Sequence, residues 1–289
     1  MSFARKRRIL CAVVFALLLS LPTTTLFGAS PAEERIISRL KNIELCNGTD
    51  RSTPEPQIKG CTALIDSPRE TTLILAIAHN NRGDAYATKR DYDRAIQDYD
   101  LSIKLNPTFS KPFNNRGVAY QKKGDYDRAI KDFDEAIKLS PDYAMAFANR
   151  AETNQRRHDY QSAARDYDNA IRLDPSLEAV WNGRCWARAI VGELQPALED
   201  CNKALLIKPG DAATLDSRGL TYLKMGQLDS AISDYDAALR IEPKMASALY
   251  GRGLARLKKG DAAGGNADIA SAQKLEKTVA KEFSRYGVN

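Results

Sequence analysis

Apolar positions recur along most of the chain with a period of 34 residues. Within each period, positions 4, 8 and 11 form one apolar set and positions 20, 24 and 27 form another, both at helical spacing. Each period therefore predicts two amphipathic helices, and a proline stands near the end of the first five periods. We call the periods units and number positions from the first residue of each. The six units cover residues 76–109, 110–143, 144–177, 178–211, 212–245 and 246–279.

The link between the two helices of a unit has a pattern of its own. Position 15 is glycine in four units, and glycine is the residue that most readily ends a helix in a left-handed conformation. An acidic residue follows at position 16 in five units, where aspartate is a good N-cap for the second helix. His158 replaces the glycine in the third unit. We therefore expect His158 to be a turn residue with a positive φ rather than a catalytic group.

The repeat resembles the tetratricopeptide repeat (TPR) family. The third, fourth and sixth units depart from the family pattern at position 11, where Asn154, Arg188 and Arg256 replace an aromatic residue. The resemblance implies an all-α fold, a right-handed α-solenoid of stacked antiparallel helix pairs (a TPR superhelix). No unit can bury its apolar face alone, so the ends of such an array need caps. The second unit meets the pattern throughout, with Phe113, Gly117, Tyr120, Ala129, Phe133, Ala136 and Pro141.

The two ends of the array depart from the repeat. We expect residues 29–75 to form an N-terminal helical cap with a partial repeat. The sixth unit loses the pattern at its end, where Lys277 replaces the proline. The closing helix around Val279 to Tyr286 is interpreted as a C-terminal cap, and residues 280–289 as the end of that cap.

Position 7 is arginine and position 23 is aspartate in every unit, where the family commonly has an apolar and an aromatic residue. Because both positions are exchanged together, we predict structural, bidentate ion pairs between the two helices of a unit or across neighbouring units. The alternative is a row of arginines that binds an acidic ligand. The residues are Arg82, Asp98, Arg116, Asp132, Arg150, Asp166, Arg184, Asp200, Arg218, Asp234, Arg252 and Asp268.

Four cysteines follow the N-terminal segment, and four cysteines allow three pairings. Cys46 and Cys61 are 15 residues apart, and Cys185 and Cys201 are 16 residues apart. These separations favour two local disulfides in an oxidising compartment. Cys185 and Cys201 occupy positions 8 and 24, which the TPR resemblance implies face each other. The alternative is that Cys201 is a small core residue without a partner.

TPR proteins typically present the first helix of each unit to a concave groove. The resemblance implies such a groove here, polar toward the N-terminus and apolar toward the C-terminus, that holds an extended or helical peptide. Trp186 is the expected anchor, because aromatic residues dominate interface energies. The alternative is that the leucines pack between adjacent first helices. The predicted groove residues are Asn80, Asn81, Asp84, Asn114, Asn115, Asn149, Trp186, Ile190, Leu220, Tyr250 and Leu254.

Asn81, Asn115 and Asn149 all stand at position 6. They resemble the asparagine ladder by which the repeat domain of O-linked N-acetylglucosamine transferase binds peptide backbone. An amide both donates and accepts hydrogen bonds, so a row of amides suits a backbone without reading its sequence. Glycine or serine interrupts the row in the last three units.

The N-terminus is basic from Arg5 to Arg8 and apolar from Ile9 to Leu21. This order predicts a signal peptide over residues 1–28, and the apolar run is shorter than the roughly 20 residues of a membrane span. Without it the net charge of +6 falls to nearly neutral. We expect export, with the bacterial periplasm as the compartment and no membrane insertion after cleavage. The alternative is an uncleaved anchor formed by residues 9–21, with the repeats outside the cytoplasm.

The sequence carries none of the motifs of nucleotide-binding, metalloprotease or serine hydrolase sites, and it has only two histidines. We therefore expect no catalytic residues, no metal and no cofactor. No basic stripe remains for nucleic acid once the N-terminus is removed. The sequence favours a non-catalytic scaffold or adaptor that binds an unidentified protein or peptide. The alternative is a self-assembling structural solenoid of the cell envelope, which forms homo-oligomers.

Overall fold

The computed structural model describes residues 30–48 and 53–288, so the predicted signal peptide lies outside the described residues. The described chain contains fifteen helices and no strand. They are α2 (Pro31–Asn47), α3 (Pro54–Ile65), α4 (Thr72–Thr88), α5 (Tyr92–Leu105), α6 (Ser110–Lys122), α7 (Tyr126–Leu139), α8 (Ala144–Arg156), α9 (Tyr160–Leu173), α10 (Glu178–Val191), α11 (Leu194–Ile207), α12 (Ala212–Lys224), α13 (Leu228–Ile241), α14 (Ala246–Lys258), α15 (Ala262–Leu275) and α16 (Val279–Arg285).

The chain divides into two compact units, residues 1–41 and residues 42–289. Within the described residues, the first of these contains only the beginning of α2. That helix begins with a capping box, in which Ser30 Oγ accepts from the Glu33 amide at 3.3 Å and Glu33 Oε2 accepts from the Ser30 amide at 2.8 Å. The hydrogen bonds from Ser30 lower the pKa of Glu33. The helix start is therefore fixed by its own first turn.

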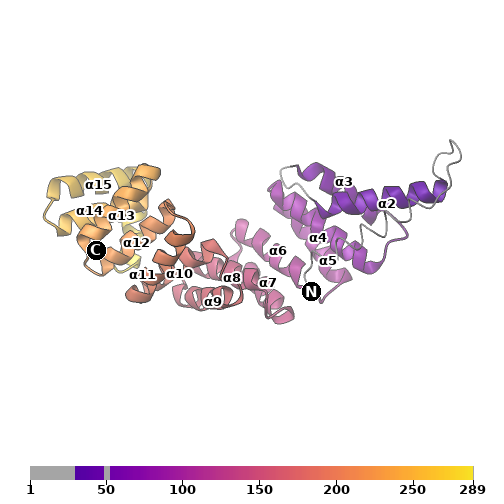
Figure 1. Ribbon diagram of the computed structural model, residues 1–289, viewed down its shortest axis with the longest axis horizontal. Helices are drawn as coiled ribbons and strands as arrows, with labels where there is room; N and C mark the ends of the chain where they lie inside the picture. The colour runs from indigo at the N-terminus through magenta and orange to yellow at the C-terminus, as the bar shows by residue number, and fades with distance from the viewer. Residues whose placement is uncertain (1–29, 49–52, 289) are drawn as a thin grey trace. The chain divides into compact units, whose positions relative to one another are not determined.

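From α4 to α15 the helices form pairs that follow one another in chain order (Figure 1). The first helix of each pair contacts its second helix, and the second helix contacts the first helix of the next pair. Successive first helices also contact one another from α4 to α14, whereas successive second helices within the described residues do not. The first helices therefore line the inner face of the stack. This arrangement confirms the predicted all-α solenoid of stacked helix pairs.

The links between paired helices follow the sequence pattern. Gly124 and the three other glycines at position 15 have positive φ, and His158 takes the same conformation with φ 65°. Asp125 then caps the second helix by accepting from the Arg128 amide at 3.1 Å. Glu193 at the same position makes no such hydrogen bond, because its longer side chain is a poorer cap.

A glycine at position 8 lets an aromatic ring at position 24 lie directly on the backbone of the first helix. A Cβ atom added to Gly117 would lie 2.7 Å from Cε1 of Phe133, whose side chain is fully buried. Gly219 stands in the same relation to Tyr235, at 2.8 Å. A larger residue in place of either glycine would force the ring or its helix to shift, because the interior is close-packed. The small residue is therefore what sets the spacing within a pair.

Each arginine at position 7 donates from Nε and Nη2 to both carboxylate oxygens of the aspartate at position 23 in its own unit, at 2.5 to 2.9 Å. Asp98 also lies 2.8 Å from Nδ1 of His79. Burial would raise the pKa of Asp98, but the hydrogen bonds from His79 and Arg82 outweigh it and the pKa lies below its usual range. The pair is thus ionised on both sides.

The third guanidinium nitrogen links each unit to the preceding one. Its Nη1 donates to the residue at position 25 of that unit, so the bridges run continuously along the stack. The contacts are Arg116 to Asp100 at 2.5 Å, Arg150 to Asp134 at 2.5 Å, Arg184 to Asp168 at 2.8 Å, Arg218 to Asn202 at 2.8 Å and Arg252 to Asp236 at 2.6 Å. The guanidinium groups are therefore engaged by acceptors of the chain itself, which supports the structural interpretation over an acidic ligand.

Two disulfides join helices that are adjacent in sequence. Cys46 of α2 pairs with Cys61 of α3, with Cα atoms 4.5 Å apart. Cys185 of α10 pairs with Cys201 of α11, with Cα atoms 5.3 Å apart. The second disulfide stands at positions 8 and 24, where the first, second, third and fifth units place a small residue against an aromatic ring. Each closes a loop of about fifteen residues, which stabilises the fold by about 3 kcal/mol in the chain-entropy model.

The ion pairs predict a specific pattern of mutational effects. Arg150→Leu leaves the Asp166 carboxylate, whose side chain is only 8% exposed, without its cation and with one hydrogen bond, from the Asn154 amide. We expect a loss of about 3 kcal/mol in the free energy of unfolding, and a smaller loss when Asp166→Leu accompanies it, because no charge is then left buried. Urea denaturation measures both.

The matched control is Arg128→Leu, which breaks a surface pair with Asp125 and is expected to change stability by less than about 1 kcal/mol. A double variant that is as unstable as the Arg150→Leu chain, or less stable, would contradict the structural role of the pair.

Candidate functional site

A row of asparagine amides follows the inner face across α4, α6 and α8. Asn115 Nδ2 donates to Asn80 Oδ1 at 3.1 Å, and Asn149 Nδ2 donates to Asn114 Oδ1 at 2.9 Å. Within α4, Asn80 Nδ2 donates to Asn81 Oδ1 at 3.1 Å, and Asn114 makes the same bond to Asn115 within α6. The amides at positions 5 and 6 therefore form one connected row rather than independent side chains.

Beside this amide row lies a cleft of about 500 Å³. Asp84 lines this cleft, where it accepts from Asn115 Nδ2 at 2.7 Å and from the Tyr99 hydroxyl at 2.8 Å. Burial and the charge of Asp84 raise the pKa of Tyr99, so its hydroxyl stays a donor. Lys111 is exposed and supplies a positive charge to the same cleft. The lining residues are Asn47, Gly48, Gln57, Asn81, Asp84, Ala87, Thr88, Tyr99, Lys111, Asn114, Asn115, Val118, Tyr143 and Met145.

The amide row ends where a tyrosine hydroxyl needs its space. A Cβ atom on Gly183 would lie 2.6 Å from the hydroxyl oxygen of Tyr167, and one on Gly251 would lie 2.4 Å from that of Tyr235. The preceding unit places the tyrosine in both cases. Asn149 follows Phe133, which carries no hydroxyl, but Asn115 follows a tyrosine, Tyr99, whose hydroxyl donates to Asp84 instead. The ring at position 24 therefore excludes a side chain at Gly183 and Gly251 but does not by itself decide which residue stands at position 6.

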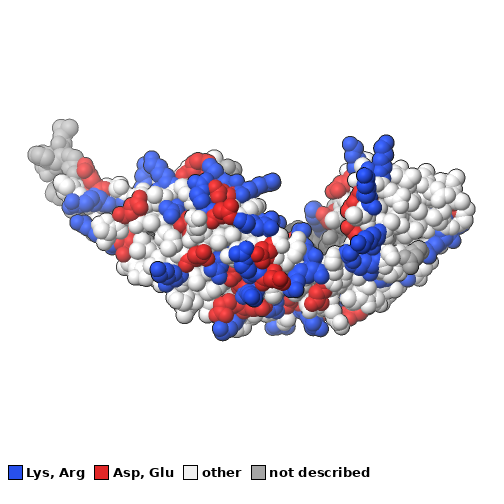
Figure 2. Space-filling view, turned by 180° about the vertical axis from the view of Figure 1, so that it is seen from behind, with Lys and Arg blue, Asp and Glu red and all other residues white. Residues whose placement is uncertain are grey.

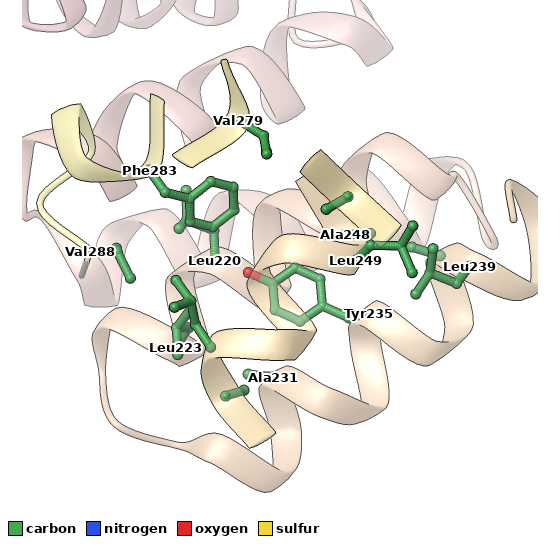
Figure 3. Packing of buried hydrophobic residues seen from close by; sticks show 14 of the residues in the cluster. Leu220, Leu223, Ala231, Tyr235, Leu239, Ala248, Leu249, Val279, Phe283 and Val288 are labelled. Carbon is green, nitrogen blue, oxygen red and sulfur yellow. The ribbon is translucent and has the colours of Figure 1, made fainter. Parts of the chain in front are cut away.

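The apolar end of the predicted groove is filled by the chain itself. The last ten described residues, 279–288, which we call the C-terminal segment, pack against the inner faces of the last units. Phe283 and Val288 belong to the same buried cluster as Leu220 and Leu223 of α12 (Figure 3). The sequence predicted a terminal cap here but not that this cap would cover the groove.

Four predicted groove residues are buried rather than exposed. Leu220 and Leu254 are 1% and 8% exposed, because the C-terminal segment and adjacent first helices cover them. Asn80 and Asn114 are 0% and 5% exposed, because they point between neighbouring first helices. These positions are corrected from partner contacts to internal packing. The remaining predicted groove residues, Asn81, Asp84, Asn115, Asn149, Trp186, Ile190 and Tyr250, are partly exposed.

The expected anchor, Trp186, makes an edge-to-face contact with Tyr286 at a centroid distance of 5.2 Å. Tyr250 contacts Phe283 at 4.8 Å. Both aromatic residues of the groove are thus already in contact with the C-terminal segment. An incoming partner would compete with this segment for both rings.

The charged side chains show no single-signed surface on the face drawn in Figure 2, where both signs mix and the C-terminal end is largely uncharged. Among residues 30–48 and 53–288, no cluster of three or more metal-ligating side chains is placed to hold an ion. None of the helices in the described part of the chain combines the length and apolar character needed to cross a membrane.

The fold and the register of the repeats define a helical-repeat protein. Residues 76–109 and 110–143 match the tetratricopeptide repeat profile, and residues 219–260 match a second profile described as TPR repeat. The chain therefore contains tetratricopeptide repeats. No curated protein is similar enough in sequence to be reported as a relative.

Several solved structures share the fold. YrrB, described as a TPR protein with an unusual peptide-binding site, is 20% identical with a TM-score of 0.58, over 68% of this chain and 98% of its own. PilW, a type IV pilus biogenesis factor, is 18% identical with a TM-score of 0.62, over 72% and 98%. A TPR protein from Parabacteroides merdae is 16% identical with a TM-score of 0.61, over 87% and 99%. The likeness concerns the fold, and the TPR fold indicates a protein-interaction scaffold.

Asp216 of α12 predicts a pH dependence of stability. Burial raises its pKa to about 7, with Glu242 adding to the shift and a hydrogen bond from Ser247 opposing it. The unfolded pKa is about 3.9, so the protonated form favours folding below about pH 4, and this stabilisation is lost as the pH rises toward 7. We expect Asp216→Asn to gain about 2 to 3 kcal/mol relative to the native chain between pH 5 and pH 7, as measured by urea denaturation.

Asp127→Asn is the matched control, because Asp127 is 79% exposed and its variant should follow the native pH profile. The prediction is contradicted if the Asp216→Asn chain and the native chain differ in their free energy of unfolding by the same amount at pH 5 and at pH 8. The Asp216 carboxyl would then not titrate between these pH values.

Proposed function

We propose that the chain is a non-catalytic adaptor that binds the backbone of an extended peptide in the polar cleft beside the amide row, outside the cytoplasm. The observation that carries the proposal is the connected amide row along one wall of that cleft. Because neighbouring amides hold one another, their orientation is fixed before a partner arrives, which reduces the entropic cost of binding.

The hydrogen-bonding capacity of Asn81 supports this use. A side-chain amide has two N–H donors and two acceptor lone pairs. Asn81 donates once, to Asn47 Oδ1 at 3.5 Å, and accepts once, from Asn80 Nδ2 at 3.1 Å. One donor and one acceptor remain for a ligand. A peptide unit offers one carbonyl acceptor and one N–H donor, which complement this donor and this acceptor. Asn81 can therefore bind a peptide backbone whatever its side chains are.

The rest of the cleft favours a peptide with mixed character. Lys111 and Asp84 offer charges of both signs, while Met145 is 43% exposed and offers an apolar contact. TPR scaffolds of known structure include YrrB, a TPR protein with a peptide-binding site. We place the partner's contacts on α4, α6 and α8, and not on the covered apolar end of the inner face.

Two features support a compartment outside the cytoplasm. Both disulfides bury their sulfur atoms between helices, and such bonds persist in oxidising environments. The basic and apolar N-terminus is the pattern of an export signal. We therefore propose the bacterial periplasm as the location.

The test uses a phage-displayed library of random decapeptides, selected on the native chain. We expect Asn81→Ala to weaken the binding of selected peptides about tenfold, because two hydrogen bonds of roughly 0.5 to 1.5 kcal/mol each are lost. Fluorescence polarisation with the labelled peptides measures the dissociation constants, and thermal denaturation checks that the variant is folded.

Lys131→Ala is the matched control, because Lys131 is an exposed residue of the second helix α7 and not part of the inner face. The proposal fails if the selected peptides bind the Asn81→Ala and Asn115→Ala chains as tightly as the native chain, or if Lys131→Ala abolishes their binding.

A further inference from the structure

The C-terminal segment lies on the inner face as a bound peptide would. Its helix α16 has seven residues, and Gly287, with φ 74°, ends it so that the Val288 amide donates to the Phe283 carbonyl at 3.0 Å. This turn brings Val288 back onto the cluster that Val279 and Phe283 enter. All three side chains are at least 93% buried, with exposures of 7%, 1% and 2% respectively.

The surface beneath the segment is built from first helices of three units. We call it the apolar patch and define it by Trp186, Leu220, Leu223, Tyr250 and Leu254. Tyr286 contacts Trp186, and Phe283 contacts both Tyr250 and Tyr286. The segment therefore covers the patch with two aromatic rings three residues apart, one within α16 and one at its C-cap.

Polar contacts at the far end of the segment come from elsewhere in the stack. Lys224 Nζ donates to the carbonyl of Tyr286 at 2.8 Å and to that of Ile190 at 3.0 Å. Arg285 Nη1 donates to Nε2 of His158 at 2.7 Å, and Tyr160 contacts the ring of Tyr286 at 6.3 Å. Lys224 of α12 thus binds a main-chain carbonyl of the C-terminal segment. Any peptide that took the same conformation could accept this hydrogen bond.

The contacts that stack the units do not pass through the segment. Residues 276–278, which connect it to α15, are exposed, and α16 contacts α14 and α15. Of the helices under it, α12 contacts α13 directly, and α14 contacts α13 and α15 directly. A seven-residue helix is too short to persist alone in water, so α16 is held by the patch rather than by its own hydrogen bonds.

We propose that the apolar patch is a second peptide-binding site, occupied in cis by the C-terminal segment, and that its partner is a short helical peptide with two aromatic residues three positions apart. The tether holds the segment at an effective concentration of about millimolar. A partner binds only when its concentration and affinity together outcompete the tethered segment. The segment therefore sets a threshold for access to the site.

The C-terminal segment itself indicates what kind of peptide the patch binds. Its chemistry, with aromatic rings at 283 and 286 and a valine at 288, is the chemistry that fits the patch. This site lies on α10, α12 and α14, whereas the polar cleft of the proposed function lies on α4, α6 and α8. Either site can therefore fail its test without affecting the other.

The probe is a fluorescein-labelled synthetic peptide with the sequence of residues 276–289, added to the whole chain. We expect the Phe283→Ala/Tyr286→Ala chain to bind it at least tenfold more tightly than the native chain, because the native site is already occupied. Adding Trp186→Ala to the double variant should reverse this gain. In the Phe283→Ala/Tyr286→Ala chain, the backbone amides of residues 279–288 should exchange hydrogen faster than in the native chain. The amides of α12 and α14 should stay protected.

Lys281→Ala/Ser284→Ala is the matched control, because both residues are exposed on the segment, and this chain should behave as the native one. If the Phe283→Ala/Tyr286→Ala chain does not fold, Tyr286→Ala alone keeps the cluster around Phe283 and should show a smaller gain in the same direction. Equal peptide binding by native and variant chains would overturn the proposal. So would loss of protection in α12 and α14, since the segment would then be part of the stack.

Discussion

The close approach of two helices over a small residue is the constraint on which the rest of this structure depends. Gly117 and Gly219 each carry an aromatic ring of the paired helix directly on their backbone. Such a pair buries one side of each helix and leaves the other side apolar, so it is stable only when further pairs cover it. The arginine bridges then fix the register, because each guanidinium binds one aspartate in its own unit and another acceptor in the preceding one.

The same packing divides the inner face into two chemically different parts. In the first three units the asparagines at positions 5 and 6 bond to one another, and the Tyr99 hydroxyl donates to Asp84 beside them. At Gly183 and Gly251 the tyrosine of the preceding unit fills the space of a side chain, so the amide row does not continue there. In the last three units the inner face is apolar and is covered by the C-terminal segment. One array thus presents two kinds of surface without any change of fold.

Much of the fold could be predicted from the sequence, because its determinants lie within one period. The helix pairs and the positive φ of His158 depend on residues within a few turns of one another. The folding back of the C-terminal segment could not be predicted in this way, since Tyr286 meets Tyr160 across several units. The burial of Asn80 could not be predicted from the sequence for a similar reason. It depends on how closely α4 and α6 approach each other rather than on the polarity of the residue.

Residue-resolved hydrogen exchange on the Gly117→Ala chain tests the central claim most directly. The added methyl group would lie 2.7 Å from Cε1 of Phe133 and force α6 and α7 apart. In a stack held by neighbours alone, exchange should accelerate in α6 and α7, less in α5 and α8, and not at all near the Cys46–Cys61 disulfide or in α14. Uniform acceleration through residues 42–288 would indicate one cooperative globule, and no acceleration in α6 and α7 would show that the glycine contact does not set the spacing.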